Sequence, residues 1–221
     1  MDKKILDKQA QHWENTFITR PETFGITPSA AAVKAAETFN KEGITNILEL
    51  GAGQGRDALF FAQKGFHIQV LDYSQTGIDK IIKKAKTLGI DKLITGKIHD
   101  VRNPFPFTNE KFGGCFSHML YCMALTAKEL QFLSNEILRV LKNGGINIYT
   151  ARHTRDSDYK NGIHRGEDLY ENDGFIVHFF SKEKVKQLLN GFDIVNIENF
   201  EERRSEGKFP RKLFRVTLKK V

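Results

Sequence analysis

The chain has 221 residues, of which 40% are hydrophobic, and this fits one large α/β domain with a substantial core. No apolar run approaches the roughly 20 residues that span a bilayer, and the N-terminal segment lacks the apolar stretch of a signal peptide. We therefore expect a cytoplasmic protein without membrane association, in which Cys115 and Cys122 are reduced and buried. The net charge of +7 fits either an anionic partner or a well-solvated surface.

Strands and helices alternate through the chain. Short apolar segments predict strands, and apolar residues three and four positions apart predict helices. The expected strands cover residues 46–50, 67–71, 92–98, 114–119, 146–151, 192–200 and 213–220. The expected helices cover residues 56–64, 75–88, 128–141 and 182–189, and further helices lie within residues 1–45 around an irregular part at 17–27. This alternation predicts an α/β fold with a mostly parallel sheet covered by helices on both faces.

Residues 152–180 interrupt the alternation. The segment is polar, charged and aromatic together, and a segment of this length inside a compact domain is usually functional or mobile. We expect it to be an insertion that closes the substrate side of the domain, followed by a closing helix and strands over residues 181–221.

The densest signal is the segment ILELGAGQGRD at residues 47–57. A strand enters a glycine-rich turn, which bends sharply and lets a ligand approach the backbone closely, and a helix leaves it with free N–H groups at its start. Asp72 ends the next strand and can accept hydrogen bonds from two ribose hydroxyls. Asp100 follows the third strand and can accept one from an exocyclic amine such as that of adenine.

The spacing of the glycines argues against a dinucleotide site. The dinucleotide fingerprint G-x-G-x-x-G would place a glycine at position 56, where this chain has Arg56 after Gly55. Glu49 precedes the first glycine by two residues. A carboxylate repels a pyrophosphate but favours a ligand that carries an amino group and a sulfonium charge.

These segments together resemble the class I S-adenosylmethionine-dependent methyltransferases. ILELGAGQGRD resembles motif I of that family, VLDYS (residues 70–74) its second motif and HDV (residues 99–101) its third. The match in order and spacing covers residues 46–150. The resemblance implies a three-layer, Rossmann-like sandwich with a seven-stranded, mostly parallel sheet whose last strand is antiparallel. It also implies S-adenosylmethionine as cofactor and S-adenosylhomocysteine as product.

The resemblance implies a role for each matching residue. The backbone at Gly51, Ala52 and Gly53 would lie against the methionine part of the cofactor. Asp72 would hold the ribose, and Tyr73 would pack on the adenine face. The remaining implied contacts are Asp100 and the Val101 N–H at the adenine edge, with Ser117 and His118 on the floor where methyl transfer occurs. The chain departs from the family at Phe112-Gly113, where the family often has an acidic residue.

The N-terminal segment resembles that of the thiopurine and tellurite-resistance methyltransferase-like group, in which it folds over the cofactor and substrate as a lid. The similar residues are HWE at 12–14 and RPETFG at 20–25. Trp13 would then lie near the sulfonium and Arg20 would meet the methionine carboxylate. Trp13 as an ordinary core residue of an amphipathic helix remains the alternative.

The methyl acceptor is predicted mainly by exclusion. Methylases of base amino groups commonly carry Asn/Asp-Pro-Pro-Tyr/Phe after the fourth strand, where this chain has SHML. We expect a small-molecule acceptor, such as a thiol or a chalcogen oxyanion, and a monomer or homodimer that does not bind nucleic acid. His118, His153 and Arg165 are the candidate catalytic residues, because a histidine or a neighbouring arginine can take a proton or bind an anion.

No histidine or cysteine spacing indicates a metal site, so we expect none. Methyl transfer needs alignment of the acceptor behind the methyl group and exclusion of water more than it needs a dedicated nucleophile. Three alternatives remain open at this point: an RNA or protein methyltransferase, an NAD(P)-dependent oxidoreductase, and a binding protein that has lost the chemistry.

Overall fold

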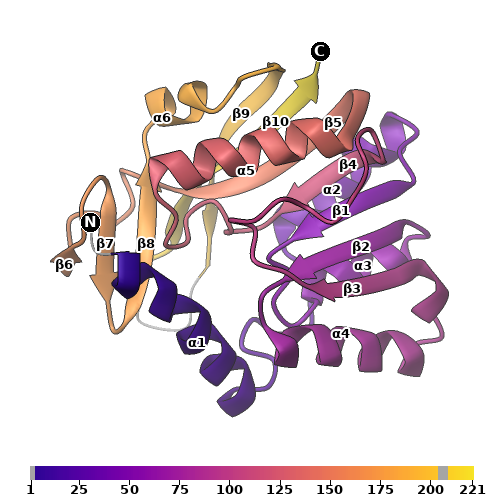
Figure 1. Ribbon diagram of the computed structural model, residues 1–221, viewed down its shortest axis with the longest axis horizontal. Coiled ribbons are helices and arrows are strands. Elements are labelled where there is room, and N and C mark those ends of the chain that lie inside the picture. The colour runs from indigo at the N-terminus through magenta and orange to yellow at the C-terminus, as the bar shows by residue number, and fades with distance from the viewer. Residues whose placement is uncertain (1–2, 204–208) are drawn as a thin grey trace.

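The computed structural model describes residues 3–203 and 209–221. Within them, seven strands form a main sheet in the order β3-β2-β1-β4-β5-β10-β9, and three more strands extend from β5 (Figure 1). The strands of the main sheet are β1 (Asn46–Leu50), β2 (His67–Asp72), β3 (Ile94–Ile98), β4 (Phe112–Ser117), β5 (Leu141–His153), β9 (Phe192–Glu202) and β10 (Arg211–Lys220). The helices are α1 (Lys3–Thr19), α2 (Ala30–Lys41), α3 (Arg56–Gln63), α4 (Gln75–Thr87), α5 (Ala127–Val140) and α6 (Lys182–Gln187), with a short 3₁₀ helix at Asp91–Leu93.

Strands β1 to β5 are parallel, and β1 lies between β2 and β4. Strand β10 runs antiparallel to both β5 and β9. The predicted seven-stranded, mostly parallel sheet with an antiparallel last strand is therefore confirmed. The strand order reverses next to β1, and open α/β sheets bind their ligands at such a point, outside the carboxyl ends of the strands.

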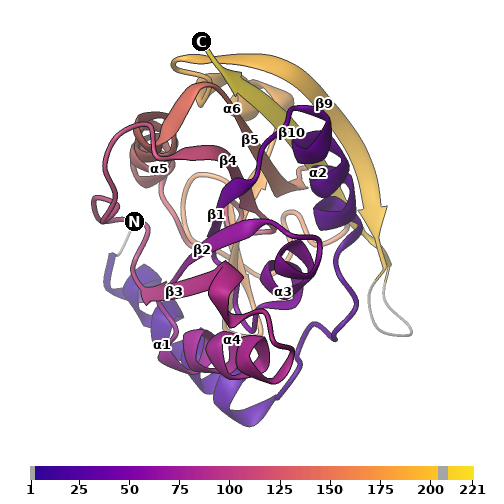
Figure 2. The same ribbon diagram turned by 90° about the vertical axis from the view of Figure 1, so that its right-hand side faces the viewer.

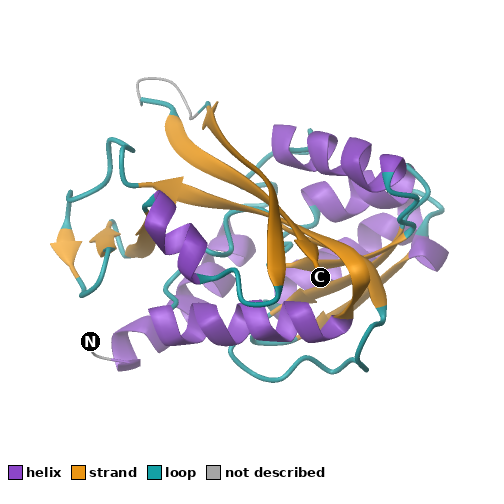
Figure 3. Cartoon of the chain, turned by 90° about the horizontal axis from the view of Figure 1, so that it is seen from above, coloured by secondary structure: helices purple, strands orange, loops and turns teal. Residues whose placement is uncertain are grey.

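Helices cover both faces of the sheet (Figures 2 and 3). On one face, α2, α3 and α4 pack through small, aromatic and aliphatic side chains such as Ala35, Phe61 and Ile81. On the other face, α5 and α6 pack through Leu133, Ile137 and Val185. Burial of these apolar surfaces supplies most of the stabilisation of the sandwich, and it fixes the positions of the loops that follow β1, β2 and β4.

Local sequence signals begin several helices where they were expected. Thr126 and Glu129 form a capping box at the start of α5, in which each side chain bonds the backbone N–H of the other. Ser74 accepts from the Gly77 N–H at the start of α4, and Ser181 accepts from the Lys184 N–H at the start of α6. These caps satisfy backbone donors that would otherwise be unpaired.

Residues 152–180 contain regular structure, which the sequence did not predict. Strand β5 continues to His153, and β6 (Ile163–His164), β7 (Leu169–Asn172) and β8 (Phe175–Phe180) form antiparallel pairs. Strand β8 also pairs with the end of β5, so the insertion is part of the sheet. The N-terminal helix is also longer than expected, because residues 17–19 belong to α1. Helix α1 contacts both β8 of the insertion and α4 of the sandwich (Figure 1).

A buried ion pair holds the start of the insertion. Arg152 is 3% exposed and Asp156 is 4% exposed, and the Arg152 Nε donates to Asp156 Oδ2 at 3.1 Å. The same guanidinium reaches Asp158 Oδ2 at 2.8 Å, and the Lys212 N–H donates to Asp156 Oδ2 at 2.7 Å. Buried charges are tolerated only when they are paired and hydrogen-bonded in this way.

None of the described helices has the length and apolar character to cross a bilayer.

Replacement of Arg152 by Met should strongly destabilise the fold. The substitution leaves Asp156 buried without its cationic partner, and such a loss costs about 3–5 kcal/mol of unfolding free energy. Lys34→Met is the matched control, because the Lys34–Glu37 pair is exposed and an exposed pair contributes about 0–1 kcal/mol. Urea-induced unfolding followed by circular dichroism measures both. Equal losses in the two variants would contradict a structural role for the buried pair.

Candidate cofactor and methyl-transfer site

The glycine-rich turn connects β1 to α3 with three glycines in left-handed conformations. The φ angles of Gly51, Gly53 and Gly55 are 67°, 56° and 84°, a region that residues with a Cβ rarely adopt. A Cβ added to Gly55 would lie 2.3 Å from Ile81 Cγ1 of α4. The turn therefore needs glycine both for its conformation and for its close packing, and it places the start of α3 at the carboxyl ends of the strands.

The Asp72 carboxylate joins the glycine-rich turn to the loop after β2. It is 7% exposed, its Oδ2 accepts from the Gly53 N–H at 2.8 Å, and its Oδ1 accepts from the Ser74 N–H at 2.8 Å. Burial raises the pKa of Asp72 to about 6, although both backbone N–H groups stabilise the charged form. The carboxylate predicted to hold a ribose thus lies beside the turn predicted to hold the rest of the cofactor.

Two buried polar atoms beside this turn have no hydrogen-bond partner among the described residues. They are Glu49 Oε2 on β1 and Ser117 Oγ on β4, and the two strands are neighbours in the sheet. Burial raises the pKa of Glu49 well above its usual value, and the nearby Asp57 carboxylate raises it further. Buried polar atoms are normally satisfied, so this part of the site fits a ligand that brings polar groups of its own.

A small cavity lies at the adenine side of the predicted site. Its volume is about 30 Å³, which is room for about one or two water molecules but not for an adenine ring. The site predictions Tyr73, Asp100, Val101 and Trp13 all line it. The other lining residues are Leu6, Gln9, Ala10, Arg102, Leu120, Met123, Ala124 and Leu125. One face of α1 therefore occupies the space in front of Asp100.

Arg102 holds the Asp100 carboxylate on the inside of this cavity. Its Nη2 lies 2.6 Å from Asp100 Oδ2 and its Nε lies 3.0 Å from Asp100 Oδ1. Burial alone would raise the pKa of Asp100, but the hydrogen bonds and charge of Arg102 lower it overall. The Arg102 Nη1 also reaches Asp7 Oδ1 of α1 at 2.5 Å, so the same arginine joins the predicted adenine-binding residue to the helix that covers it.

Helix α1 is fastened to the cofactor loops by polar contacts. Glu14 Oε1 accepts from the Thr76 N–H at 3.1 Å, and Glu14 Oε2 accepts from the Ser74 hydroxyl at 2.5 Å. Gln54, inside the glycine-rich turn, donates to the Arg20 carbonyl at 3.0 Å and accepts from the Thr23 N–H at 2.8 Å. The N-terminal segment therefore lies over the cofactor loops, in the place expected for a lid.

Trp13 and Arg20 lie in different environments on this segment. Trp13 packs among aromatic rings, with centroid distances of 4.9 Å to Phe175, 5.6 Å to Phe17 and 6.0 Å to Phe24. The side chain of Arg20 is exposed, and its carbonyl is the group that contacts the glycine-rich turn. Trp13 thus combines a packing role with a place at the cavity, and the contact of Arg20 with the methionine carboxylate stays a prediction.

The structure does not bring the three candidate catalytic residues together by direct contact. His118 follows β4 and pairs with Glu202 of β9 at 3.0 Å. His153 stacks on Phe214 with a centroid distance of 4.2 Å, and burial followed by the charge of Arg155 lowers its pKa. Arg165 makes its described contacts inside the insertion, where it pairs with Glu171 at 2.6 Å. His118 is therefore the candidate whose position at the end of β4 matches the predicted floor.

Several residues of the site carried no recognisable sequence signal. Arg102 and Glu202 lie on different elements and meet their partners only in the folded chain. Glu14 belongs to the HWE segment, but its bonds to Ser74 and Thr76 were not predicted. Gln54 occupies a variable position of the glycine motif, and its contacts with residues 20–23 depend on where α1 ends. Both cysteines are buried, as expected.

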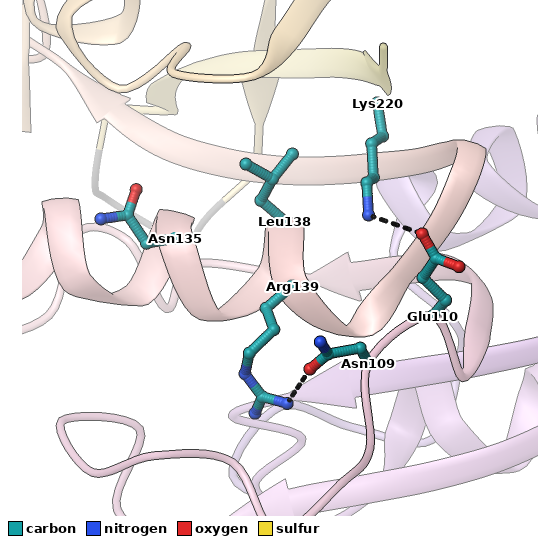
Figure 4. Close-up of a pocket in the computed structure, with 6 residues that line it drawn as sticks. All are labelled: Asn109, Glu110, Asn135, Leu138, Arg139 and Lys220. Carbon is teal, nitrogen blue, oxygen red and sulfur yellow. Dashed lines mark hydrogen bonds and ion pairs between the residues drawn. The ribbon is translucent and has the colours of Figure 1, made fainter.

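A larger hollow lies at the opposite end of the parallel strands from the glycine-rich turn. Figure 4 shows the residues that line it. Its volume is about 510 Å³, and it lies beside the end of α5 and the amino ends of β4 and β5. Its polar groups contact one another: Arg139 donates to Asn109 Oδ1 at 3.1 Å, and Lys220 pairs with Glu110 at 3.7 Å. Since ligands of open α/β sheets bind at the carboxyl ends of the strands, this hollow is not the site built by the glycine-rich turn.

Comparisons with known proteins agree with this geometry. A family model described as a methyltransferase domain matches residues 47–145. The chain is 31% identical over 66% of its length to phosphoethanolamine N-methyltransferase 1 of Triticum aestivum, and 24% identical over 72% of its length to a tRNA N(3)-cytidine methyltransferase of Gallus gallus. It covers only 26% and 45% of those two proteins.

Solved structures share the fold. The Burkholderia thailandensis 1,6-didemethyltoxoflavin-N1-methyltransferase, bound to 1,6-didemethyltoxoflavin and S-adenosylhomocysteine, superposes with a TM-score of 0.73 at 15% identity, over 100% of this chain and 91% of that one. TehB of Haemophilus influenzae superposes with a TM-score of 0.67 at 15% identity, over 95% of this chain and 67% of that one. At such identities the likeness shows the fold alone. Residues 47–145 thus match a methyltransferase domain, and the chain shares the fold of these structures.

Proposed function

We propose that this protein transfers the methyl group of S-adenosylmethionine to a small-molecule acceptor. The observation that carries the proposal is the buried Asp72 carboxylate, placed between the Gly53 and Ser74 N–H groups and beside the unpartnered Glu49 Oε2 and Ser117 Oγ. A pyrophosphate would meet two buried acids here. A ligand with ribose hydroxyls, an ammonium group and a sulfonium charge meets complementary groups.

The residues present fit the cofactor. Asp72 would accept from the ribose hydroxyls, and the backbone of Gly51–Gly53 would lie along the methionine part, whose ammonium group would face Glu49. Asp100 and the Val101 N–H would bind the adenine edge. The bound cofactor supplies a methyl group on a positively charged sulfur, and the protein's own contribution is to align the acceptor and exclude water.

The position of α1 bears on how the cofactor enters the site. The cavity of about 30 Å³ between α1 and Asp100 is much smaller than adenine. Some contacts of α1 with the cofactor loops are polar and replaceable by water, such as those of Glu14 with Ser74 and Thr76, and Phe17 adds an apolar contact with Gly53. We infer that α1 opens for exchange of cofactor and closes again over the reactants, which would exclude water during methyl transfer.

Two features support a small acceptor. Helix α1 and strand β8 lie together beside the carboxyl ends of the parallel strands, and this enclosure suits a small molecule better than a polymer. The chain also lacks the Asn/Asp-Pro-Pro-Tyr/Phe motif of many base methylases after β4. The predicted thiols and chalcogen oxyanions are to be tested in one panel with amines and phenols.

An RNA acceptor is the second candidate. The net charge of +7 favours an anionic partner, and one of the relatives is named as a tRNA methyltransferase. A steep loss of RNA binding as salt rises, together with methylation of the bound RNA, would favour this candidate over a small acceptor.

Asp72→Asn should weaken S-adenosylhomocysteine binding at neutral pH and remove its dependence on pH between 5 and 7. The ionised carboxylate accepts both ribose hydroxyls, and the pKa of Asp72 is raised to about 6. The dissociation constant of the wild-type protein should therefore fall about tenfold as pH rises from 5 to 7. Glu14 and Glu49 are the other acids near Asp72.

Isothermal titration calorimetry measures this effect. Asp79→Asn, an exposed carboxylate on the neighbouring helix α4, is the matched control and should bind as the wild type does. If Asp72→Asn also bound with unchanged affinity at pH 7, the ribose assignment would be wrong.

A coupled assay of homocysteine release across thiols, metalloid oxyanions, amines, phenols and RNA should identify the acceptor class. We expect turnover with at least one small molecule. Asp72→Asn should lose at least tenfold in kcat/KM, because a binding difference equivalent to one pKa unit changes an equilibrium constant about tenfold. Turnover with RNA alone would overturn the proposal in favour of the second candidate.

A further inference from the structure

A hydroxyl, an imidazole and a carboxylate from three strands form one hydrogen-bonded chain at the end of β4. His118 Nε2 lies 3.0 Å from Glu202 Oε1 of β9, and His118 Nδ1 lies 3.0 Å from Thr150 Oγ1 of β5. The side chains of His118 and Glu202 are 12% and 22% exposed, and Thr150 is fully buried. The fold thus brings together residues that are 84 positions apart in the sequence.

The charge state of Glu202 fixes the proton on one nitrogen of His118. Burial alone would raise the pKa of Glu202, but the hydrogen bond and charge of His118, with the charges of Arg211 and Arg56, lower it to about 2. An ionised carboxylate only accepts hydrogen bonds, so Nε2 of His118 carries a proton and donates it. The Nδ1 nitrogen is then the basic one, and it accepts from the Thr150 hydroxyl.

The backbone after His118 supports this arrangement. Met119 has a φ of 67°, a left-handed conformation that is unfavourable for a residue with a side chain. The turn directs the Met119 N–H to Thr150 Oγ1 at 2.8 Å. One oxygen lone pair of Thr150 is thereby engaged, and the other can accept a hydrogen bond when Nδ1 becomes protonated. Strained residues held by such contacts cluster at functional sites.

The chain of groups lies next to the cofactor site. His118 follows Ser117, whose buried Oγ has no partner among the described residues. Two residues later, the Leu120 side chain lies against Gly51, where an added Cβ would be 3.0 Å from Leu120 Cδ1. The charged groups that influence Glu202 are His118 of the β4 end, Arg211 of β10 and Arg56 of α3.

We propose that His118, positioned by Glu202 and Thr150, accepts the proton that the methyl acceptor loses. The proposal rests on the proposed function, and it narrows the acceptor to an amine or hydroxyl whose reacting atom bears a proton. The lone pair of that nitrogen or oxygen forms a bond to the methyl carbon, and the carbon–sulfur bond breaks with its electron pair left on sulfur. Because Nδ1 already accepts the Thr150 hydroxyl, the acceptor's proton passes to Thr150 Oγ1 as that hydroxyl's own proton passes to Nδ1. The resulting imidazolium is balanced by the Glu202 carboxylate.

Kinetic comparison of His118→Gln, Glu202→Gln and Glu201→Gln tests the proposal. Glu201 is an exposed carboxylate next to Glu202 on β9 and is the matched control. With an amine or hydroxyl acceptor, wild-type kcat/KM should rise with pH and level off. His118→Gln should lose about 100-fold in kcat and lose this rise. Glu202→Gln should move the rise to lower pH, because the imidazolium loses its balancing charge, and Glu201→Gln should match the wild type.

A second measurement needs no acceptor. In the complex with S-adenosylhomocysteine, ¹⁵N–¹H spectra of the histidine rings should show neutral His118 protonated on Nε2, and Glu202→Gln should change the tautomer ratio. Binding of S-adenosylhomocysteine by the three variants shows that they are folded. A wild-type protein that bound no S-adenosylhomocysteine would count against the proposed function instead. Normal kcat and an unchanged pH profile in His118→Gln, or His118 protonated on Nδ1 in the wild type, would overturn the proton-acceptor role.

Discussion

The contacts of a single carboxylate hold the cofactor site together. Asp72 ends β2, and its two oxygens accept from backbone N–H groups in two different loops, at Gly53 and at Ser74. The sheet places β1 and β2 side by side, so these loops must lie close together, and the carboxylate fixes their separation. Its burial has an electrostatic cost, which appears as a raised pKa and which hydrogen bonds from a bound ribose would offset.

Helix α1 depends on the same loops. Glu14 bonds the start of α4 immediately after Asp72, and Gln54 of the glycine-rich turn bonds the segment that follows α1. Arg102 joins Asp7 of α1 to Asp100. The described chain therefore holds α1 against Asp100 through Arg102, and we infer that binding of the cofactor exchanges these contacts for its own. Such an exchange links the affinity for the cofactor to the position of the helix.

The sequence predicted the parts of the fold that depend on local pattern. Apolar segments and capping residues such as Ser74 and Ser181 located the strands and helices of the core, and the glycine spacing located the site. The strands within residues 152–180 were missed, because a sequence of mixed polar and aromatic residues acquires its strand pairing only from the neighbouring end of β5. The helical state of residues 17–19 was missed because the packing of Phe17 against Gly53 is a long-range contact.

Side-chain partners were less predictable than positions. His118 was recognised because it ends a strand at the expected floor, but Glu202 and Thr150 lie on other strands and form the network only through the antiparallel β10 between β5 and β9. Arg165 was predicted as a catalytic candidate because it is next to His164 in the sequence. In the structure it pairs with Glu171 inside the insertion.

The most direct measurement is a crystal structure of the protein with S-adenosylhomocysteine. The account predicts that the ribose hydroxyls lie on Asp72, that the adenine occupies an enlarged cavity beside Asp100 and Val101, and that α1 is displaced from its present position. Density for the ligand away from the glycine-rich turn, or a bound ligand whose ribose does not contact Asp72, would contradict it.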